Sequence, residues 1–279
     1  MVAPFLIAFL VFQLGPLLAS FAMAFTDMTS RDLRDPFSVD FVGIDNFTKL
    51  FGDPRFLQGL GNTALFVIGA LPLTIICALV LAVALNNGIQ RFKGFFRTAF
   101  YVPVVTTTVA VAVVWKYLFA DHGVVNGVLE WFGVDGANYL QDSGWAMPVV
   151  ILLGVWRMTG LIMVLFLAGL QGIPTELYEA ATVDGANAWR RFRSITIPLL
   201  VPTLLLASVI LSVGFVQVFE EPFVLTQGGP LGSTTTASLF VYDLFGFGRY
   251  GEASAASYVL FVVIALLALV QFRVFRRRT

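Results

Sequence analysis

A polar stretch between two long apolar runs reads QGIPTELYEAATVDGANAWRRFRSITIP at residues 171–198. Pro174 suits the first turn of a helix, where its missing N–H is not needed, and Glu176 and Glu179 favour the positive end of the helix dipole. Gly185 can adopt a backbone conformation that is costly for other residues. The stretch therefore predicts two short helices joined at a glycine, a shape suited to being pushed by another protein.

The chain on both sides of this stretch is too apolar for a soluble domain. Hydrophobic residues make up 58% of its 279 positions, charged residues make up 12%, and the mean hydropathy is +0.87. These values place the chain among membrane proteins. The formal net charge of zero says little about partners, and no feature suggests a nucleic-acid binder. The lone cysteine, Cys77, excludes an intrachain disulfide and argues against a cysteine metal site.

Six apolar stretches are each about 20 residues long, enough to cross ~30 Å of hydrocarbon as a helix. They lie at about 2–25, 62–85, 98–119, 146–170, 195–218 and 252–275. We therefore expect an all-α integral membrane protein with six transmembrane helices, organised as a single transmembrane domain over residues 1–279. The first stretch is interpreted as a retained helix rather than a signal peptide. Asn62 is expected to cap the second helix.

Basic residues gather in three places that this topology puts on one side of the membrane. They occupy the loop after the second helix, the loop after the fourth helix and the C-terminus, and they are Arg91, Lys93, Arg97, Arg190, Arg191, Arg193, Arg273, Arg276, Arg277 and Arg278. The opposite loops are rich in aspartate and glutamate. Because cytoplasmic loops carry the excess of lysine and arginine, both termini and residues 171–198 are expected to be cytoplasmic.

The chain lacks the motifs of an enzyme. None of its lysines follows a glycine, as the lysine of a Walker A loop does, so any ATP-driven step must be supplied by another subunit. The single histidine, His122, cannot form a histidine metal cluster, and no Ser/His/Asp arrangement is present. We expect no catalytic residue, no metal site and no cofactor in this chain.

Arg157 lies near the middle of the fourth apolar stretch. A buried arginine costs several kcal/mol in a membrane, so its side chain is expected to face a cavity or a partner rather than lipid. Two interpretations stay open at this point. Arg157 either belongs to a transport pathway or makes a structural hydrogen bond to a helix end or loop carbonyl.

Two external segments also have a defined pattern. Gly228, Gly229 and Pro230 predict a turn whose backbone can approach another surface closely, and a plain surface turn is the alternative. Residues 124–132 predict a short helix in the membrane interface.

The central stretch closely resembles the EAA loop of binding-protein-dependent ABC importer permeases. The matching residues are Glu179-Ala180-Ala181, then Gly185 after three residues, then Ile195-Thr196-Ile197-Pro198 after nine more. Ile197 stands where a leucine is frequent. Further matches, which look like the sugar-importing, maltose-permease-like branch and the actinobacterial trehalose importer type within it, are Trp156-Arg157, residues 170–174, residues 184–186 and residues 226–230.

The resemblance spans essentially the whole chain and implies a type I ABC importer permease fold in a bacterial plasma (inner) membrane. It implies three protein partners: a second homologous permease, an ABC ATPase dimer that holds ATP and Mg²⁺, and an extracytoplasmic substrate-binding protein. The first helix of the EAA loop would be the coupling helix that rests in an ATPase cleft. The coupling residues carried over are Glu176, Tyr178, Glu179, Ala180, Ala181, Asp184 and Gly185.

The resemblance also implies a carbohydrate substrate, an oligosaccharide or a disaccharide. Ring stacking and hydrogen bonds to hydroxyl groups are then expected from Trp156, Arg157, Gln217 and Phe219. The binding protein is expected to dock at Thr226, Gly228, Gly229 and Pro230. A glycerol-phosphate or polyol permease is one alternative, since Arg157 would favour a phosphate. A secondary carrier or channel is another, but repeats and intramembrane ion-binding carboxylates are missing.

Overall fold

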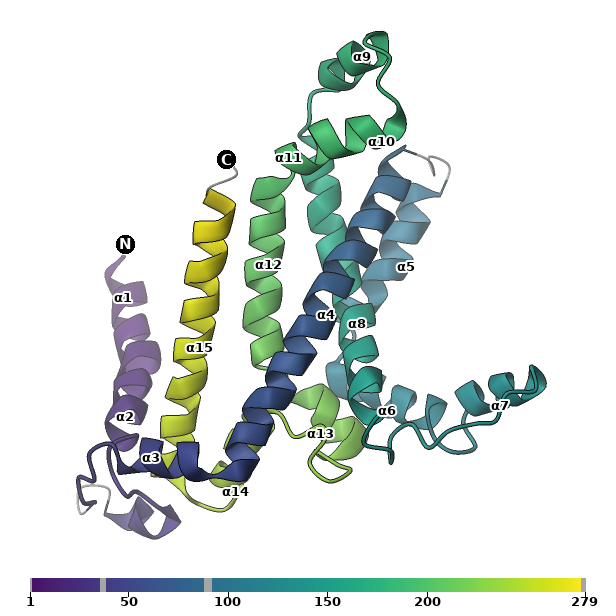
Figure 1. Cartoon of the computed structure of the whole chain (residues 1–279). Coiled ribbons are helices and arrows are strands. Elements are labelled where there is room, and N and C mark those ends of the chain that lie inside the picture. The colour runs from purple at the N-terminus through teal and green to yellow at the C-terminus, as the bar shows by residue number, and fades with distance from the viewer. Residues whose placement is uncertain (1, 36–38, 88–91, 277–279) are drawn as a thin grey trace.

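The computed structural model describes residues 2–35, 39–87 and 92–276, and most of these residues are helical. Long helices stand side by side, several short helices lie at one end of them, and α9 and α10 project from the other end (Figure 1). The elements are α1 (Ala3–Phe9), η1 (Leu10–Leu14), α2 (Gly15–Met23), η2 (Ser30–Arg34), α3 (Asp45–Gly52), α4 (Pro54–Asn87), α5 (Lys93–Val105), α6 (Thr108–Leu118), α7 (Val124–Trp131), α8 (Ala146–Gln171), α9 (Thr175–Val183), α10 (Ala188–Arg191), η3 (Phe192–Thr196), α11 (Ile197–Leu199), α12 (Val201–Val216), α13 (Glu220–Thr226), α14 (Ala237–Gly246) and α15 (Tyr250–Arg276).

Four helical segments are long and apolar enough to cross a membrane: Ala3–Met23, Pro54–Asn86, Ala146–Gln171 and Tyr250–Phe275. Two bent pairs bring the number to six if each pair is one span. They are Lys93–Val105 with Thr108–Leu118, bent by 98°, and Ala188–Leu199 with Val201–Val216, bent by 65°. Of the predicted spans, those at 2–25, 62–85, 146–170 and 252–275 are therefore found as single segments, and those at 98–119 and 195–218 are each divided by a bend.

The break between α5 and α6 occurs where three successive threonines interrupt the apolar run. Thr106 and Thr107 are both extended, and the Thr106 hydroxyl donates to the carbonyl of Val102 at 2.9 Å. Threonine loses rotamer freedom in a helix and offers the backbone an alternative hydrogen bond, so a run of them favours a helix end. As a result α6 turns away from α5 and packs against α13.

Two prolines follow a helical turn that contains more residues than an α-helical turn. The N–H of Gly15 donates to the carbonyl of Leu10 immediately before Pro16, and the N–H of Ile197 donates to the carbonyl of Phe192 immediately before Pro198. Each bond spans five residues, as in a π turn. Because proline has no N–H and crowds the carbonyl four residues earlier, a local π turn lets the helix continue into it.

The core lies along the contact between α4 and α8 and is closed by α5 and α12. Phe66 of α4 meets Phe215 of α12 edge to face, with ring centroids 5.3 Å apart. A side chain at Gly154 would meet the Phe66 ring, and one at Gly160 would overlap the carbonyl of Phe100. Small residues at these positions let the helices approach closely, as is usual in membrane bundles.

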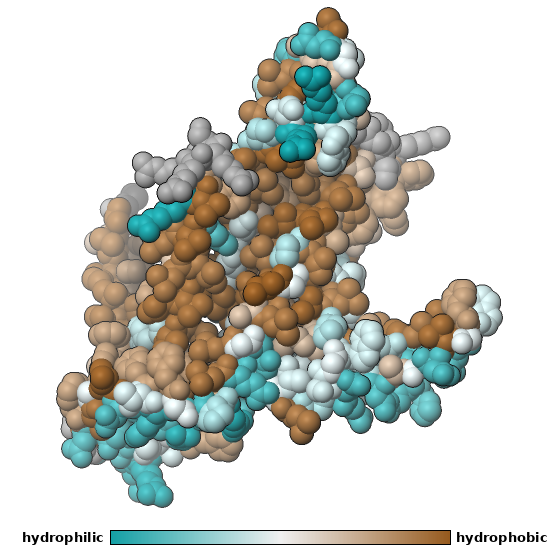
Figure 2. Space-filling model, viewed as in Figure 1, coloured by the Kyte–Doolittle hydropathy of each residue, from teal (hydrophilic) through white to brown (hydrophobic). Residues whose placement is uncertain are grey.

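The surface around this core is an apolar band with polar margins, and Figure 2 shows brown residues over the long helices and teal residues at both ends.

At the end opposite α9, the segment after α2 is tied back by Asn46, whose amide donates to the carbonyls of Ala24 and Thr26. Hydrogen bonds from the Thr29 N–H and hydroxyl lower the pKa of Asp32 in the same segment.

Candidate functional site

The predicted helix–glycine–helix stretch is present at one end of the bundle. A helix does begin next to Pro174, although Pro174 precedes the first residue of α9 instead of lying in its first turn, and Gly185 closes the helix with φ +75°. The N–H of Gly185 donates to Thr182, and the N–H of Ala186 donates to Ala181. A side chain at Gly185 would meet no atom within 4 Å. The glycine is therefore required for its backbone conformation and not for space.

The predicted coupling residues divide between two faces of α9. Glu176, Glu179, Ala180 and Asp184 are exposed on a helix that lies beyond the ends of the long helices (Figure 1). Within the described residues, neither Glu176 nor Glu179 has an ion-pair partner. The outer face thus offers carboxylates and a small side chain, a combination suited to close contact with a basic or hydrogen-bonding surface.

Tyr178 faces inward, and its hydroxyl lies 2.9 Å from the hydroxyl of Thr196. A second tie runs from the guanidinium of Arg191 to the hydroxyl of Thr182 at 2.7 Å. Both ties connect α9 to the segment that leads through η3 and α11 into α12. The sequence did not predict these two ties, because nothing local in the pattern pairs positions 9 or 18 residues apart.

Arg157 of α8 pairs with Glu221, the second residue of α13. Its Nε and Nη2 atoms lie 3.2 and 3.0 Å from one carboxylate oxygen of Glu221. Only 4% of Glu221 is exposed. The structural alternative predicted a carbonyl acceptor, and the acceptor is instead a carboxylate from a stretch just beyond the fifth predicted span. The pair fastens α13, which folds back between α8 and α6.

The remaining predicted pathway residues lie on or next to the helices at the end of the bundle opposite α9 (Figure 1). Trp156 is exposed, and its ring centroid lies 5.7 Å from that of Trp115 on α6. Phe219 stacks on Phe223 and contacts the ring of Tyr242. Gln217 is exposed at the end of α12. In the described part of the chain, the ring contacts of Phe219 do not include Trp156, so the structure gives two aromatic groups rather than one.

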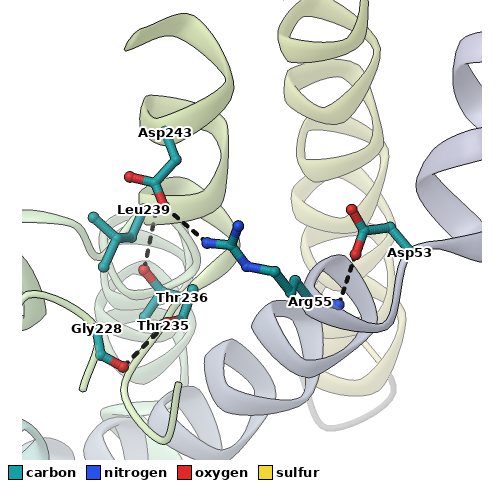
Figure 3. Close-up of polar contacts among 7 residues, drawn as sticks. All are labelled: Asp53, Arg55, Gly228, Thr235, Thr236, Leu239 and Asp243. Atoms are coloured by element: carbon teal, nitrogen blue, oxygen red, sulfur yellow. Dashed lines mark hydrogen bonds and ion pairs between the residues drawn. The ribbon is translucent and has the colours of Figure 1, made fainter. Parts of the chain in front are cut away.

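The predicted docking residues belong to an internally bonded loop at residues 226–236. The Thr226 hydroxyl lies 2.6 Å from that of Thr234, which donates to the carbonyl of Gly229. Thr235 donates to the carbonyl of Gly228, and Thr236 caps α14 by accepting from Leu239 (Figure 3). Pro230 is half-buried. A plain surface turn is therefore an incomplete description of this loop.

The same loop is held against α4 by amide side chains. Asn62 donates to the carbonyls of Gly232 and Thr235, and Gln58 donates to the carbonyl of Leu231. The prediction that Asn62 caps a helix is wrong, because α4 begins at Pro54 and Asn62 lies inside it. While these loop carbonyls accept hydrogen bonds from α4, the side chain of Leu231 is directed outward and Leu231 is 92% exposed.

An ion pair between Arg55 and Asp243, at 3.3 Å, joins the start of α4 to α14 beside this loop (Figure 3).

Of the basic residues used to predict the orientation, Arg91, Arg277 and Arg278 lie outside the described residues. Lys93 and Arg97 lie on α5, and Arg190, Arg191 and Arg193 lie in the segment after α9. The residues of this set that the structure describes thus share the end of the bundle that carries α9 (Figure 1).

Comparison with known proteins gives consistent matches over nearly the whole chain. Residues 70–279 match the family model described as binding-protein-dependent transport system inner membrane component. The lactose transport system permease protein LacF of Rhizobium radiobacter is 38% identical, over 99% of this chain and 93% of its own length. The trehalose/maltose transport system permease protein MalF of Thermococcus litoralis is 33% identical, over 100% of this chain and 93% of its own.

A solved structure supports the same relationship. One chain of the bacterial alginate ABC transporter, crystallised in complex with an alginate pentasaccharide-bound periplasmic protein, matches with a TM-score of 0.84 and 29% sequence identity. The match covers 99% of this chain and 93% of that chain.

Proposed function

Because this chain belongs to the family of binding-protein-dependent transport system inner membrane components, we propose that it carries a carbohydrate through the membrane as one permease of an ATP-driven importer. The family and the all-helical fold expected from the EAA loop are confirmed. As a member of that family, the chain is a multi-pass membrane transport subunit and not an enzyme. The observation that carries the proposal is the exposed helix α9, which ends in the glycine turn of the EAA loop.

The named relatives support a carbohydrate as the substrate. One is named for lactose, one for trehalose and maltose, and the matching structure holds an alginate-bound periplasmic protein. Trehalose is one disaccharide within this class and is not singled out by these relatives. A glycerol-phosphate substrate has less support, because Arg157, the cation that would favour a phosphate, already pairs with Glu221.

The two ends of the bundle suit different partners. We assign α9 to an ABC ATPase dimer that holds ATP and Mg²⁺, because its exposed carboxylates are free of ion pairs within the described residues. We assign the opposite end, with loop 226–236, to the substrate-binding protein. A second homologous permease would complete the pathway. The basic residues around α9 favour a cytoplasmic position for that end and for both chain termini.

Transport by the reconstituted complex tests the coupling assignment. Glu179→Lys reverses the charge on the exposed face of α9, so we expect carbohydrate uptake to fall at least tenfold while the permease still inserts. Glu130→Lys is the matched control, since Glu130 is an exposed carboxylate on α7 at the other end. Uptake at the parental rate in Glu179→Lys would show that this face does not couple to the ATPase.

Thermal shifts of the binding protein with trehalose, maltose, lactose and glycerol 3-phosphate would identify the substrate class.

A further inference from the structure

A cavity of about 1210 Å³ lies beneath the coupling helix, between the C-terminal half of α4, the end of α8 and the α9–η3 segment. Its wall on α4 is apolar and includes Ile76 and Val80. Its other end is polar and includes Tyr178 and Arg191. We call this cavity the α4–α10 pocket. Apart from Tyr178, its lining residues are not among the predicted coupling and docking residues.

The apolar wall of the pocket is continuous with the surface of the membrane-spanning helices. Ile76 and Val80, one helical turn apart on α4, are 57% and 62% exposed. Both belong to the apolar part of the long helix, which Figure 2 shows as a brown band below the teal residues around α9 and α10. A wall of this kind is stable only when hydrocarbon or another apolar surface covers it.

The polar end of the pocket is cationic. Arg191 lines it directly, and the ammonium group of Lys93 donates to the carbonyl of Asn86, another lining residue, at 3.3 Å. The described lining residues include no aspartate or glutamate. Trp189 stands beside Arg191 and is largely exposed, and tryptophan is enriched at the boundary between hydrocarbon and water.

We propose that the α4–α10 pocket binds an anionic phospholipid. Its phosphate would lie against Arg191 and Lys93, and one acyl chain would extend along Ile76 and Val80. Basic pockets between transmembrane helices on the cytoplasmic side suit anionic headgroups, and an acyl chain removes the apolar wall from water. The assignment to the inner leaflet rests on the proposed function, which places α9 in the cytoplasm.

A phospholipid in this pocket contacts the coupling apparatus directly. Tyr178 and Thr196 both line the cavity, and their hydroxyl groups form the tie between α9 and η3. Headgroup charge is therefore expected to influence how firmly α9 is held, and the ATP hydrolysis of the complex should depend on the anionic lipid content of the bilayer.

Photocrosslinking in the intact complex tests the ligand. We would place benzoylphenylalanine at Val80, reconstitute the complex in nanodiscs with equal phosphatidylglycerol and phosphatidylcholine, irradiate, and identify adducts by mass spectrometry. We expect a phosphatidylglycerol adduct in excess over phosphatidylcholine. Arg191→Gln should lower that excess about fivefold, the effect of one cation near an anionic headgroup.

Two control variants separate lipid binding from local damage. Thr182→Val removes the hydrogen bond from Arg191 but keeps its charge, and Arg193→Gln removes an exposed arginine that does not line the pocket. Both should retain the lipid excess. An adduct with a protein subunit, or equal capture of the two lipids by the parent, would overturn the proposal. This readout does not depend on transport, so its failure is distinct from failure of the proposed function.

Discussion

Arg157 and Glu221 carry opposite charges at a depth where neither side chain is well solvated, since 19% and 6% of their side chains are exposed. Removing one member of such a pair leaves an uncompensated charge, which typically costs about 3–5 kcal/mol. We expect Arg157→Met or Glu221→Leu alone to lower the Tm of the purified complex clearly. The double variant should recover most of that loss, because two apolar side chains replace both charges.

The same double variant distinguishes the two interpretations of Arg157. If the pair only fastens α13, the double variant transports carbohydrate at close to the parental rate. If Arg157 contacts the substrate, transport falls although the Tm has recovered. Single variants with an unchanged Tm would show that the pair does not hold α13 in place.

Gly185 allows a graded test because only its backbone conformation is constrained. Its φ of +75° costs roughly 1–2 kcal/mol for an ordinary residue and less for asparagine. Gly185→Asn should therefore keep most uptake, and Gly185→Val should lose more. Gly185→Pro should abolish uptake, since proline fixes φ near −65° and removes the N–H that donates to Thr182. Uptake and co-purification of the ATPase measure the series, and an equal effect of all three variants would contradict the conformational explanation.

Sequence analysis predicted Gly185 and missed Glu221 for physical reasons. The conformation of a glycine at a helix end is determined by the few residues around it, so local pattern is sufficient. The partner of Arg157 lies 64 positions away, and a glutamate next to a proline after an apolar run has the pattern of an external loop. Only the folding back of α13 brings the two charges together.

At the scale of elements, α9 is joined to the segment before α12 by two side-chain hydrogen bonds. Each of these hydrogen bonds contributes on the order of 1 kcal/mol to holding α9 in place. If both are removed, we expect α9 to move without carrying α12 with it. We expect the double variant Tyr178→Phe with Thr182→Val to hydrolyse ATP while carbohydrate uptake falls severalfold. Each single variant should have a smaller effect.

Thr98→Val is the matched control for loss of a hydroxyl, because within the described residues the Thr98 hydroxyl donates to the carbonyl of Gly94 in its own helix and to no other helix. The ratio of uptake to ATP hydrolysis in proteoliposomes measures the outcome. A ratio equal to that of the parent in the double variant would mean that the backbone alone transmits the motion of α9.

The bend between α5 and α6 shows the limit of hydropathy as a guide to helices. Residues 98–119 are apolar enough for one span, and hydropathy is not sensitive to helix direction. The three threonines at the bend were the available signal, but membrane helices often contain threonine without a break. The packing of α6 against α13 decides the outcome, and that contact joins segments about 100 residues apart.

At the scale of the whole molecule, the two ends of the bundle differ in composition and in the residues that they expose. Both the first residues of α1 and the last turns of α15 lie toward the end that carries α9 (Figure 1). Loop 226–236 lies at the opposite end, beside α13 and α14. The orientation proposed from the basic residues therefore predicts that reagents outside the cell can reach loop 226–236 but not α9.

Cysteine labelling of two matched positions tests that orientation. Val183 on α9 and Leu231 on the loop are 88% and 92% exposed, so a cysteine at either position should be accessible with little cost in stability. The native Cys77 is exposed and is first replaced by serine. A membrane-impermeant maleimide should label Leu231→Cys in intact cells and Val183→Cys only after permeabilisation. The reverse pattern would place α9 outside, where no ATPase could act on it, and would overturn both the orientation and the coupling assignment.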